Sequence, residues 1–359
     1  MRFTKRTISN PARQKGTALV TVVLIAAVVI VMVVESVKTV RFQKQLSTNL
    51  INRDQAYSYL IGMEELAKIY LKKAFEAEKG DTVHLGQLWA QDDITFPIDG
   101  GAMTASIKDM QSCFNLNTIA EEASTKNQNN SKNSNSNNLN SGGQGAATPG
   151  QKILEELIEK VKEDSDSIGK DLAEALKDWV DEDSEPSGAS DAEDSYYQGL
   201  ELPYLAANSL IAHESELMTI KGYDQKLYQQ LRPYVCVLPD SQVNQINVNT
   251  ITGESAALVY AVLSIASSST QNSNSYSLSD VSKAISDRPE DGYENVQDFI
   301  QAMGSSGKAA STDYLDVTSH YFQMTAKAEI GKTRVEMKTL FKKEDDNNFK
   351  VVSRYFGRE

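Results

Sequence analysis

The residues with the clearest capacity for chemistry are the carboxylates of an acidic stretch over residues 179–194. Calcium takes six to eight hard oxygen ligands in flexible geometry, and acidic side chains along a bent loop can supply them. The spacing does not match an EF-hand loop, and acidic loops are more often simply solvated, so the sequence alone leaves both interpretations open. The candidate ligands are Asp181, Asp183, Glu185, Asp191 and Asp194.

The chain has only two cysteines, Cys113 and Cys236. If the domain lies in an oxidising compartment, a disulfide between them is the economical interpretation, and two buried thiols are the alternative. Neither cysteine has a second cysteine or a histidine at the spacing of a zinc site. Because the pair flanks a stretch predicted to be helical, a bond would tie the beginning of that stretch to its end.

The remaining residues do not form a catalytic motif. His84, His213 and His320 are not part of an HExxH pattern, and the chain lacks a GxSxG elbow and a glycine-rich phosphate loop. Residues 221–224 and INVNT at 246–250 are similar to helix-hairpin-helix elements, which grip DNA phosphates in other proteins. The net charge of −13 argues against nucleic acid and favours a structural use of this hairpin. We therefore expect neither an enzyme nor a nucleic-acid-binding protein.

The amino terminus predicts a membrane anchor. Residues 1–16 carry five basic side chains and no acidic ones, and residues 17–34 have no charge, glycine or proline. Eighteen helical residues span about 27 Å, enough to cross most of a bilayer core. The apolar run is too long for a cleaved secretory signal, and the basic leader stays cytoplasmic, so the bulk of the chain is exported. Gly16 directly before the run is typical of prepilin peptidase substrates, and an ordinary signal-anchor is the alternative.

The rest of the chain predicts an α+β fold. Helical spacing continues to residue 79, which gives a rod of roughly 90 Å whose upper apolar stripe would pack on the domain. Extended runs on both sides of Gly100 predict a β-hairpin, and residues 321–357 predict two more, with turns at Gly331 and at 345–347. Amphipathic helices are expected at 151–163, 168–181, 205–221, 224–232, 252–266, 279–286 and 293–303.

These elements suggest an organisation in which helical segments interrupt a sheet domain. The Asn- and Ser-rich range 124–150 cannot build a core and is expected to be disordered. The predicted parts are a leader at 1–16, a transmembrane segment at 17–34, an exported helix at 35–79, a pilin-like α+β domain at 80–117, 235–250 and 314–359, a helical insertion at 118–234, and a second helical segment at 251–313.

Several motifs in order along the chain resemble one known family, the minor pseudopilin K of the bacterial type II secretion system. The resembling stretches are RQKGTALV (13–20), NLINRDQAYSYLIGMEELAK (49–68), CFNLN (113–117), LKDWVDEDSEPSGASDAEDSYY (176–197), PYLAANSLIAHESELMTIKGYD (203–224), LRPYVCVLP (231–239) and INVNT (246–250). The resemblance implies a long N-terminal pilin helix packed on an antiparallel sheet, with a large all-α insertion of SAM or helix-hairpin-helix type.

The resemblance also implies a function. Family members sit at the tip of a short periplasmic pseudopilus, start its assembly with minor pseudopilins I and J, and support export of folded proteins across the outer membrane. By this resemblance, prepilin peptidase cuts between Gly16 and Thr17, and Thr17 becomes the methylated amino terminus. The expected partners are the two minor pseudopilins, the major pseudopilin through the N-terminal helix, the secretin and exoproteins. The expected location is the inner membrane of a Gram-negative bacterium, single pass, with the globular domain in the periplasm.

The resemblance further implies calcium in the acidic stretch, where family members bind it. A minor pilin of a type IV pilus, acting in assembly or adhesion, is the alternative function. Thr17 also departs from the phenylalanine or methionine that usually begins a mature pilin.

Thr21 occupies the fifth mature position, where most pilins carry a glutamate. A lone carboxylate in lipid costs about 2.5–3.5 kcal/mol, and in a filament the amino terminus of a neighbouring subunit is thought to offset that cost. A threonine can instead return its hydroxyl hydrogen bond to its own helix. A subunit without this carboxylate needs no neighbouring subunit above it, as expected at the tip of a filament. The alternative is that Thr21 is merely a tolerated residue in the membrane segment.

Overall fold

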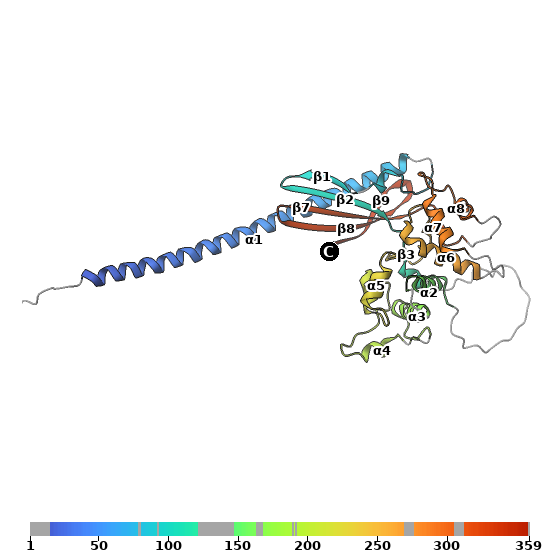
Figure 1. Ribbon diagram of the computed structural model, residues 1–359, viewed down its shortest axis with the longest axis horizontal. Helices are drawn as coiled ribbons and strands as arrows, with labels where there is room; N and C mark the ends of the chain where they lie inside the picture. The colour runs from blue at the N-terminus through green and yellow to red at the C-terminus, as the bar shows by residue number, and fades with distance from the viewer. Residues whose placement is uncertain are drawn as a thin grey trace, which may run out of the picture.

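The computed structural model describes residues 15–77, 80–91, 93–120, 147–162, 168–188, 190, 192–268, 276–304 and 312–357. Within these residues the chain forms a long helix, a five-stranded sheet that packs on its distal half, and a helical unit beside one end of the sheet (Figure 1). The expected α+β fold, with a long N-terminal helix on an antiparallel sheet and a large helical part, is confirmed.

Helix α1 (Lys15–Ala77) has 63 residues, which corresponds to a length of about 95 Å. Its first half projects away from the rest of the molecule (Figure 1), and the large apolar side chains there are exposed. In the second half, buried side chains recur every three or four residues and face the sheet: Ala56, Leu60, Met63, Ala67, Leu71, Ala74 and Phe75. One continuous helix therefore combines a projecting apolar rod with a packed amphipathic segment.

The sheet has the order β1-β2-β7-β8-β9, and all its neighbouring strands are antiparallel. The predicted hairpins are confirmed, because β1 turns into β2 at Gly100 (φ 81°) and β7 into β8 at Gly331 (φ 60°), where glycine has no Cβ to clash. The strands are β1 (Ile94–Ile98), β2 (Gly101–Asp109), β7 (Tyr321–Ile330), β8 (Thr333–Lys343) and β9 (Phe349–Gly357).

A buried ion pair fastens α1 to the far edge of this sheet. Glu64 is 1% exposed and accepts hydrogen bonds from Arg354 Nε (2.7 Å) and Nη2 (2.6 Å), and from Thr339 Oγ1 (3.1 Å). Burial alone would raise the pKa of Glu64, but the hydrogen bonds from Arg354 and Thr339 outweigh it and lower the pKa. The carboxylate therefore stays charged between helix and sheet, and it links α1 to both β8 and β9.

The helical unit contains α2 (Pro149–Val161), α3 (Gly169–Val180), α4 (Asp194–Gln198), α5 (Gln225–Leu231), α6 (Ala256–Ser268), α7 (Leu278–Ser286) and α8 (Val296–Ala302). It also includes the short 3₁₀ turns η2 (Leu116–Ala120), η3 (Glu214–Thr219) and η4 (Gly253–Ser255). Helix α2 packs against both α3 and α6, and one hydrophobic core runs through all these packed helices. The ranges 118–234 and 251–313, which the sequence treats as separate segments, thus share one core.

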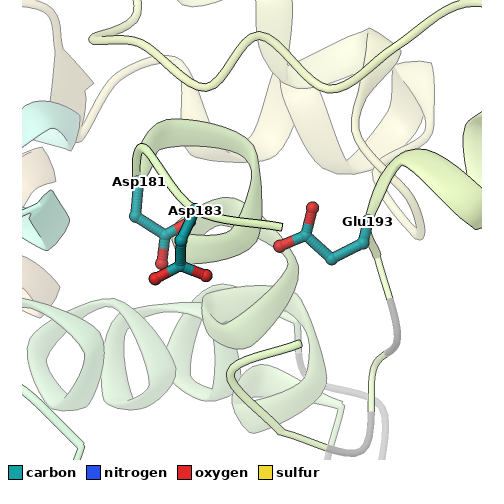
Figure 2. Close-up of side chains that lie close together, drawn as sticks. All are labelled: Asp181, Asp183 and Glu193. Atoms are coloured by element: carbon teal, nitrogen blue, oxygen red, sulfur yellow. The ribbon is translucent and has the colours of Figure 1, made fainter. Parts of the chain in front are cut away.

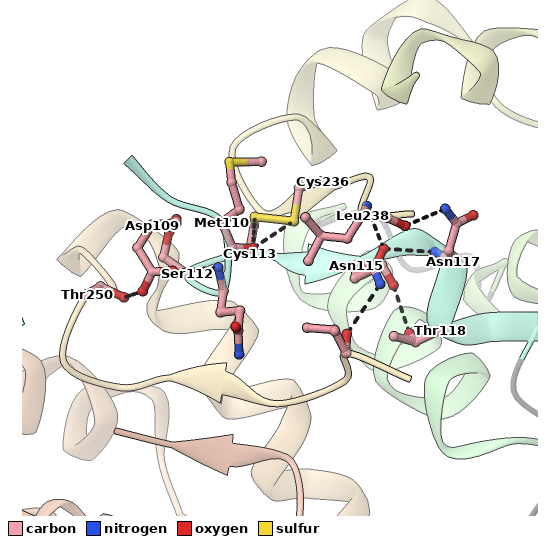
Figure 3. The surroundings of a disulfide bond; sticks show 12 residues. Asp109, Met110, Ser112, Cys113, Asn115, Asn117, Thr118, Cys236, Leu238 and Thr250 are labelled. Atoms are coloured by element: carbon pink, nitrogen blue, oxygen red, sulfur yellow. Dashed lines mark hydrogen bonds between the residues drawn. A yellow bond between two sulfur atoms is a disulfide. The ribbon is translucent and has the colours of Figure 1, made fainter. Parts of the chain in front are cut away.

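Each of these two ranges leaves and rejoins the rest of the fold through a short parallel strand pair. β3 (Phe114–Asn115) pairs with β4 (Val235–Cys236), and β5 (Ile246–Asn247) pairs with β6 (Leu315–Asp316). Cys113 and Cys236 form a disulfide beside the first pair, with S–S 2.20 Å and Cα–Cα 5.8 Å (Figure 3). The disulfide therefore joins the chain just before the first helical range to the chain just after it.

Two expectations about local structure are wrong. Residues 205–221 form no α-helix: the chain is irregular up to the 3₁₀ turn η3, because Pro203 lacks an amide donor and Asn208 lies at φ 43°, outside helical geometry. The range expected to be disordered also ends earlier than position 150, since the Thr148 side chain caps α2, which begins at Pro149. Residues 124–146 of that range lie outside the described residues.

Candidate functional site

Asp178 organises the acidic stretch that follows α3. It is fully buried near the end of that helix, and its carboxylate accepts hydrogen bonds from Ser187 N (2.7 Å), Ser190 Oγ (3.3 Å) and Ala192 N (3.4 Å). These three donors come from the loop that runs from α3 to α4, so Asp178 folds the loop back onto the helix end. The loop therefore has a defined shape in place of the free conformations of a solvated acidic segment.

This folding brings three further carboxylates together (Figure 2). Asp181 and Asp183 lie just after α3, and Glu193 directly precedes α4 and points toward them. Each residue offers an oxygen, and these oxygens lie within 4.8 Å of one another. Among the residues that the structure describes, no other group of three or more metal-ligating side chains meets this condition.

The electrostatics of the group are unfavourable without a cation. Glu193 is 2% exposed, neither of its carboxylate oxygens has a hydrogen-bond partner, and Asp181 Oδ1 also has none. Burial, reinforced by repulsion from Asp178 and Asp181, raises the pKa of Glu193 to about 7. Burial, reinforced by repulsion from Asp183 and Asp178, raises the pKa of Asp181 to about 6. Three carboxylates this close together, with both oxygens of the buried Glu193 and one oxygen of Asp181 left without a donor, fit a hard divalent cation such as calcium.

Asn208 provides a further oxygen next to the group. Its Nδ2 donates to the backbone carbonyl of Asp183 (3.2 Å), and its buried Oδ1 has no hydrogen-bond partner. Amide oxygens are ordinary calcium ligands. The sequence analysis did not select Glu193 or Asn208. Glu193 lies within the acidic stretch, but its spacing does not distinguish it from the other acids. Asn208 lies outside that stretch, and only the fold brings it close to Asp183.

The other predicted ligands are placed differently. Glu185 is exposed, and its backbone N–H donates to Asp183 Oδ1 (2.8 Å). Asp194 Oδ1 accepts from Ala206 N (2.9 Å), so it holds the segment after α4. Asp191 lies outside the described residues. Of the five predicted side chains, the structure thus brings Asp181 and Asp183 into the cluster.

The asparagine-rich motifs at the strand pairs are structural. Asn115 Nδ2 donates to Asp240 O and Val243 O, and its Oδ1 accepts from Leu238 N (3.0 Å) and Asn117 N (Figure 3). These bonds join the CFNLN segment to the chain that follows β4. The Asn115 side chain therefore satisfies backbone groups that have no partner in a regular strand pair.

Asp109, at the end of β2, is the centre of a second polar junction. It is 2% exposed and accepts from Ser319 Oγ (2.6 Å), Thr250 Oγ1 (2.6 Å), Asn247 Nδ2 (3.2 Å) and Gln111 N (2.8 Å). Burial raises its pKa, and the four hydrogen bonds oppose that shift. The INVNT motif, which supplies Asn247 and Thr250, thus connects the sheet to the helical unit.

The predicted processing site lies at the start of α1. Gly16 and Thr17 fall within the first turn of the helix, and their side chains lie outside the described residues. Thr21 Oγ1 donates to Ala18 O at 2.9 Å, which satisfies the hydroxyl within its own helix. In the described chain, α1 is the one helix long and apolar enough to cross a membrane, and none of its most apolar window is buried.

The long helix on an antiparallel sheet, with an inserted helical unit, defines a pseudopilin-type protein with one apolar N-terminal helix. Models of type II secretion system protein K match residues 112–240 and 246–318. The chain is 31% identical to type II secretion system protein K of Aeromonas hydrophila, over 96% of this chain and 98% of that protein. It is 32% identical to the Klebsiella pneumoniae protein of the same name, over 96% and 97%. The chain therefore belongs to the type II secretion system protein K family, and the predicted resemblance is confirmed.

A solved structure has the same architecture. One chain of the GspK–GspI–GspJ complex from the enterotoxigenic Escherichia coli type 2 secretion system superimposes with a TM-score of 0.68 and 26% sequence identity. The alignment covers 87% of this chain and 99% of that one. The boundary between the two family models falls between β4 and β5, where the chain passes from one helical range to the next.

Proposed function

We propose that this minor pseudopilin occupies the tip of the type II secretion pseudopilus, where it starts assembly with minor pseudopilins I and J. The observation that carries the proposal is the arrangement of α1 and the helical unit. The apolar half of α1 projects free, as a segment that packs among similar helices would, and the helical unit widens the opposite end of the molecule (Figure 1). A subunit of this shape can insert the apolar half of α1 into a bundle of helices while the helical unit at its other end stays uncovered.

Further support comes from Thr21 and from the relatives. Position 21 is a threonine in place of the usual glutamate, and its hydroxyl donates within α1. The helix therefore has no carboxylate at this position that would need the amino terminus of a neighbouring subunit. The related GspK was solved in a complex with GspI and GspJ, which suggests the same partners here. The family match favours secretion over the type IV pilus alternative.

In this proposal the apolar part of α1 first anchors the chain in the inner membrane, with the globular part in the periplasm. Prepilin peptidase cuts at Gly16–Thr17, and the released helix then packs against the major pseudopilin. The role is structural rather than enzymatic: the helical unit meets the secretin or exoproteins during export of folded proteins. Calcium bound by Asp181, Asp183 and Glu193 would neutralise the carboxylates and hold the loop between α3 and α4 in place.

Processing and assembly test this function together. Gly16→Asn, which places a side chain at the cleavage site, is expected to keep the leader and to abolish co-purification with the two minor pseudopilins. Gly62→Ala in the same helix is the matched control, since nothing lies within 4 Å of the added Cβ. Amino-terminal sequencing of the mature wild-type chain should begin at Thr17. A retained Met1 in cells with a working peptidase would contradict the proposal.

A further inference from the structure

Exposed apolar side chains lie on the segment that follows α4. Their exposed fractions are 81% (Leu202), 57% (Leu205), 46% (Met218) and 38% (Tyr204), and the Tyr204 hydroxyl donates to Thr219 O, beside Met218. We call these four residues the apolar loop. Single exposed apolar residues are ordinary, but a cluster of them on a soluble surface marks an interaction site. In the remainder of the described helical unit, the other exposed large apolar residues are Leu278 and Leu210, and Leu210 lines a hollow with Lys342 and Lys350 of the sheet.

The backbone that carries these exposed side chains is held in place by hydrogen bonds. Tyr204 N donates to Tyr197 O (3.4 Å) and the Tyr204 hydroxyl donates to Thr219 O (2.7 Å), which ties the segment to the end of η3. Farther along, Ala206 N donates to Asp194 Oδ1 (2.9 Å), and Ile211 N donates to Asn117 Oδ1 (2.8 Å). A surface held in place before it binds loses little conformational entropy on association, which favours affinity.

The charge around the loop restricts the partner. Residues 181–219 contain no lysine or arginine, and their exposed acidic side chains outside the carboxylate cluster are Glu182, Glu185 and Glu201. An anionic bilayer surface and a nucleic acid would both be repelled. The helical unit also lies at the end of the molecule opposite the apolar part of α1 (Figure 1), so in the proposed arrangement it stands away from the membrane. A protein surface that places lysine and arginine around an apolar centre fits both features.

We propose that the apolar loop is a docking surface for a folded protein whose contact surface has an apolar centre ringed by lysine and arginine. The inference rests on the proposed function and deepens it, because it assigns the part of the tip subunit that meets a partner beyond the pseudopilus. Leu202 and Leu205 fill the apolar centre of that contact. The exposed Glu201, next to Leu202 in the chain, pairs with the basic rim.

Secretion and assembly are measured together to test the inference. The double variant Leu202→Ser, Leu205→Ser in the full chain is expected to lower the protein content of the culture medium about tenfold, as loss of a central apolar contact would. Co-purification with the two minor pseudopilins should be unchanged. Leu278→Ser, at a residue 42% exposed outside the loop, is the control and should leave both measurements at wild-type levels. Leu202→Met, Leu205→Met should retain secretion.

The outcomes separate this inference from the proposed function. Normal secretion by the double serine variant would overturn the inference and leave the tip function standing. Loss of co-purification by the same variant would also overturn it, because the loop would then serve assembly. If the wild-type chain itself failed to co-purify, the proposed function would be wrong.

Photocrosslinking identifies what the loop touches. A benzophenone amino acid at position 205 of the full chain in secreting cells is expected to form an adduct with a protein, through a peptide that contains lysine or arginine beside apolar residues. The same group at position 278 should not form it. Glu201→Lys should reduce the adduct severalfold. Adducts with lipid alone, no adduct at position 205, or an adduct that charge reversal leaves unchanged would each refute the inference.

Discussion

Replacing Glu193 by glutamine should stabilise the protein without calcium and weaken its response to calcium. The substitution keeps the shape of the side chain and removes one negative charge from a cluster whose oxygens lie within 4.8 Å. Since burial and repulsion raise the pKa of Glu193 to about 7, its charged form is destabilised in the folded state near neutral pH. We expect a gain of about 1 to 2 kcal/mol in the free energy of unfolding, because solvent screens part of the repulsion.

Calcium should reverse the order of stability. At a calcium concentration of about 100 times Kd, binding stabilises the wild type by about 2.7 kcal/mol. For a chain of 359 residues that corresponds to a rise in Tm of about 4 °C. Glu193→Gln, which offers calcium one neutral oxygen in place of a carboxylate, should lose most of that rise. The variant is therefore expected to melt above the wild type in chelator and below it in saturating calcium.

The assay is thermal unfolding of the detergent-solubilised full chain, followed by the fluorescence of Trp179. Trp179 lies two residues before Asp181 in the chain and packs against Tyr197. The second tryptophan, Trp89, can be replaced by phenylalanine so that the signal comes from Trp179 alone. Glu185→Gln is the matched control, because its side chain is exposed and lies outside the cluster. Equal calcium shifts in the two variants, or a lower Tm of Glu193→Gln in chelator, would refute the assignment of Glu193.

The same cluster sets the pH dependence without calcium. The folded-state pKa values of Asp181 and Glu193 are raised from 3.8 to about 6 and from 4.5 to about 7. The folded state then holds protons that the unfolded state has released, so these groups lower stability as pH rises from about 4 to 7. Melting in chelator at pH 5 and pH 7.5 should show this loss, and Glu193→Gln should reduce it. An equal pH response of wild type and variant would contradict the expectation.

Three further perturbations test other parts of the fold. Arg354→Met leaves the buried carboxylate of Glu64 without its partner and should cost about 3 kcal/mol in denaturant unfolding, with part recovered by adding Glu64→Gln; a wild-type midpoint would refute this. Replacing Cys113 and Cys236 by serine opens a closure with a sequence separation of 123 residues and should cost up to about 5 kcal/mol, so unchanged stability under non-reducing conditions would contradict it. Thr21→Glu restores a membrane carboxylate and should alter pseudopilus initiation, measured by secretion; unaffected secretion would remove the argument from Thr21.

Local patterns in the sequence determined much of the fold. The uncharged run from 17 to 34 predicts the apolar half of α1, because helix formation there needs only its own backbone hydrogen bonds. Gly100 and Gly331 mark the hairpins, since their positive φ values are easy only for glycine. The ordered motifs also identified the family, because several in sequence rarely coincide by chance.

Only the tertiary structure decided what depends on residues far apart in the chain. Helical spacing at 205–221 is overridden by hydrogen bonds from Ala206 N to Asp194 and from Ile211 N to Asn117, which satisfy backbone donors of this segment without a helix. Glu193 is a ligand candidate because Asp178 bends the loop, and nothing in the spacing of the acids indicates that bend. The shared core of the two helical ranges likewise forms across the chain, where burial of apolar area outweighs local preference.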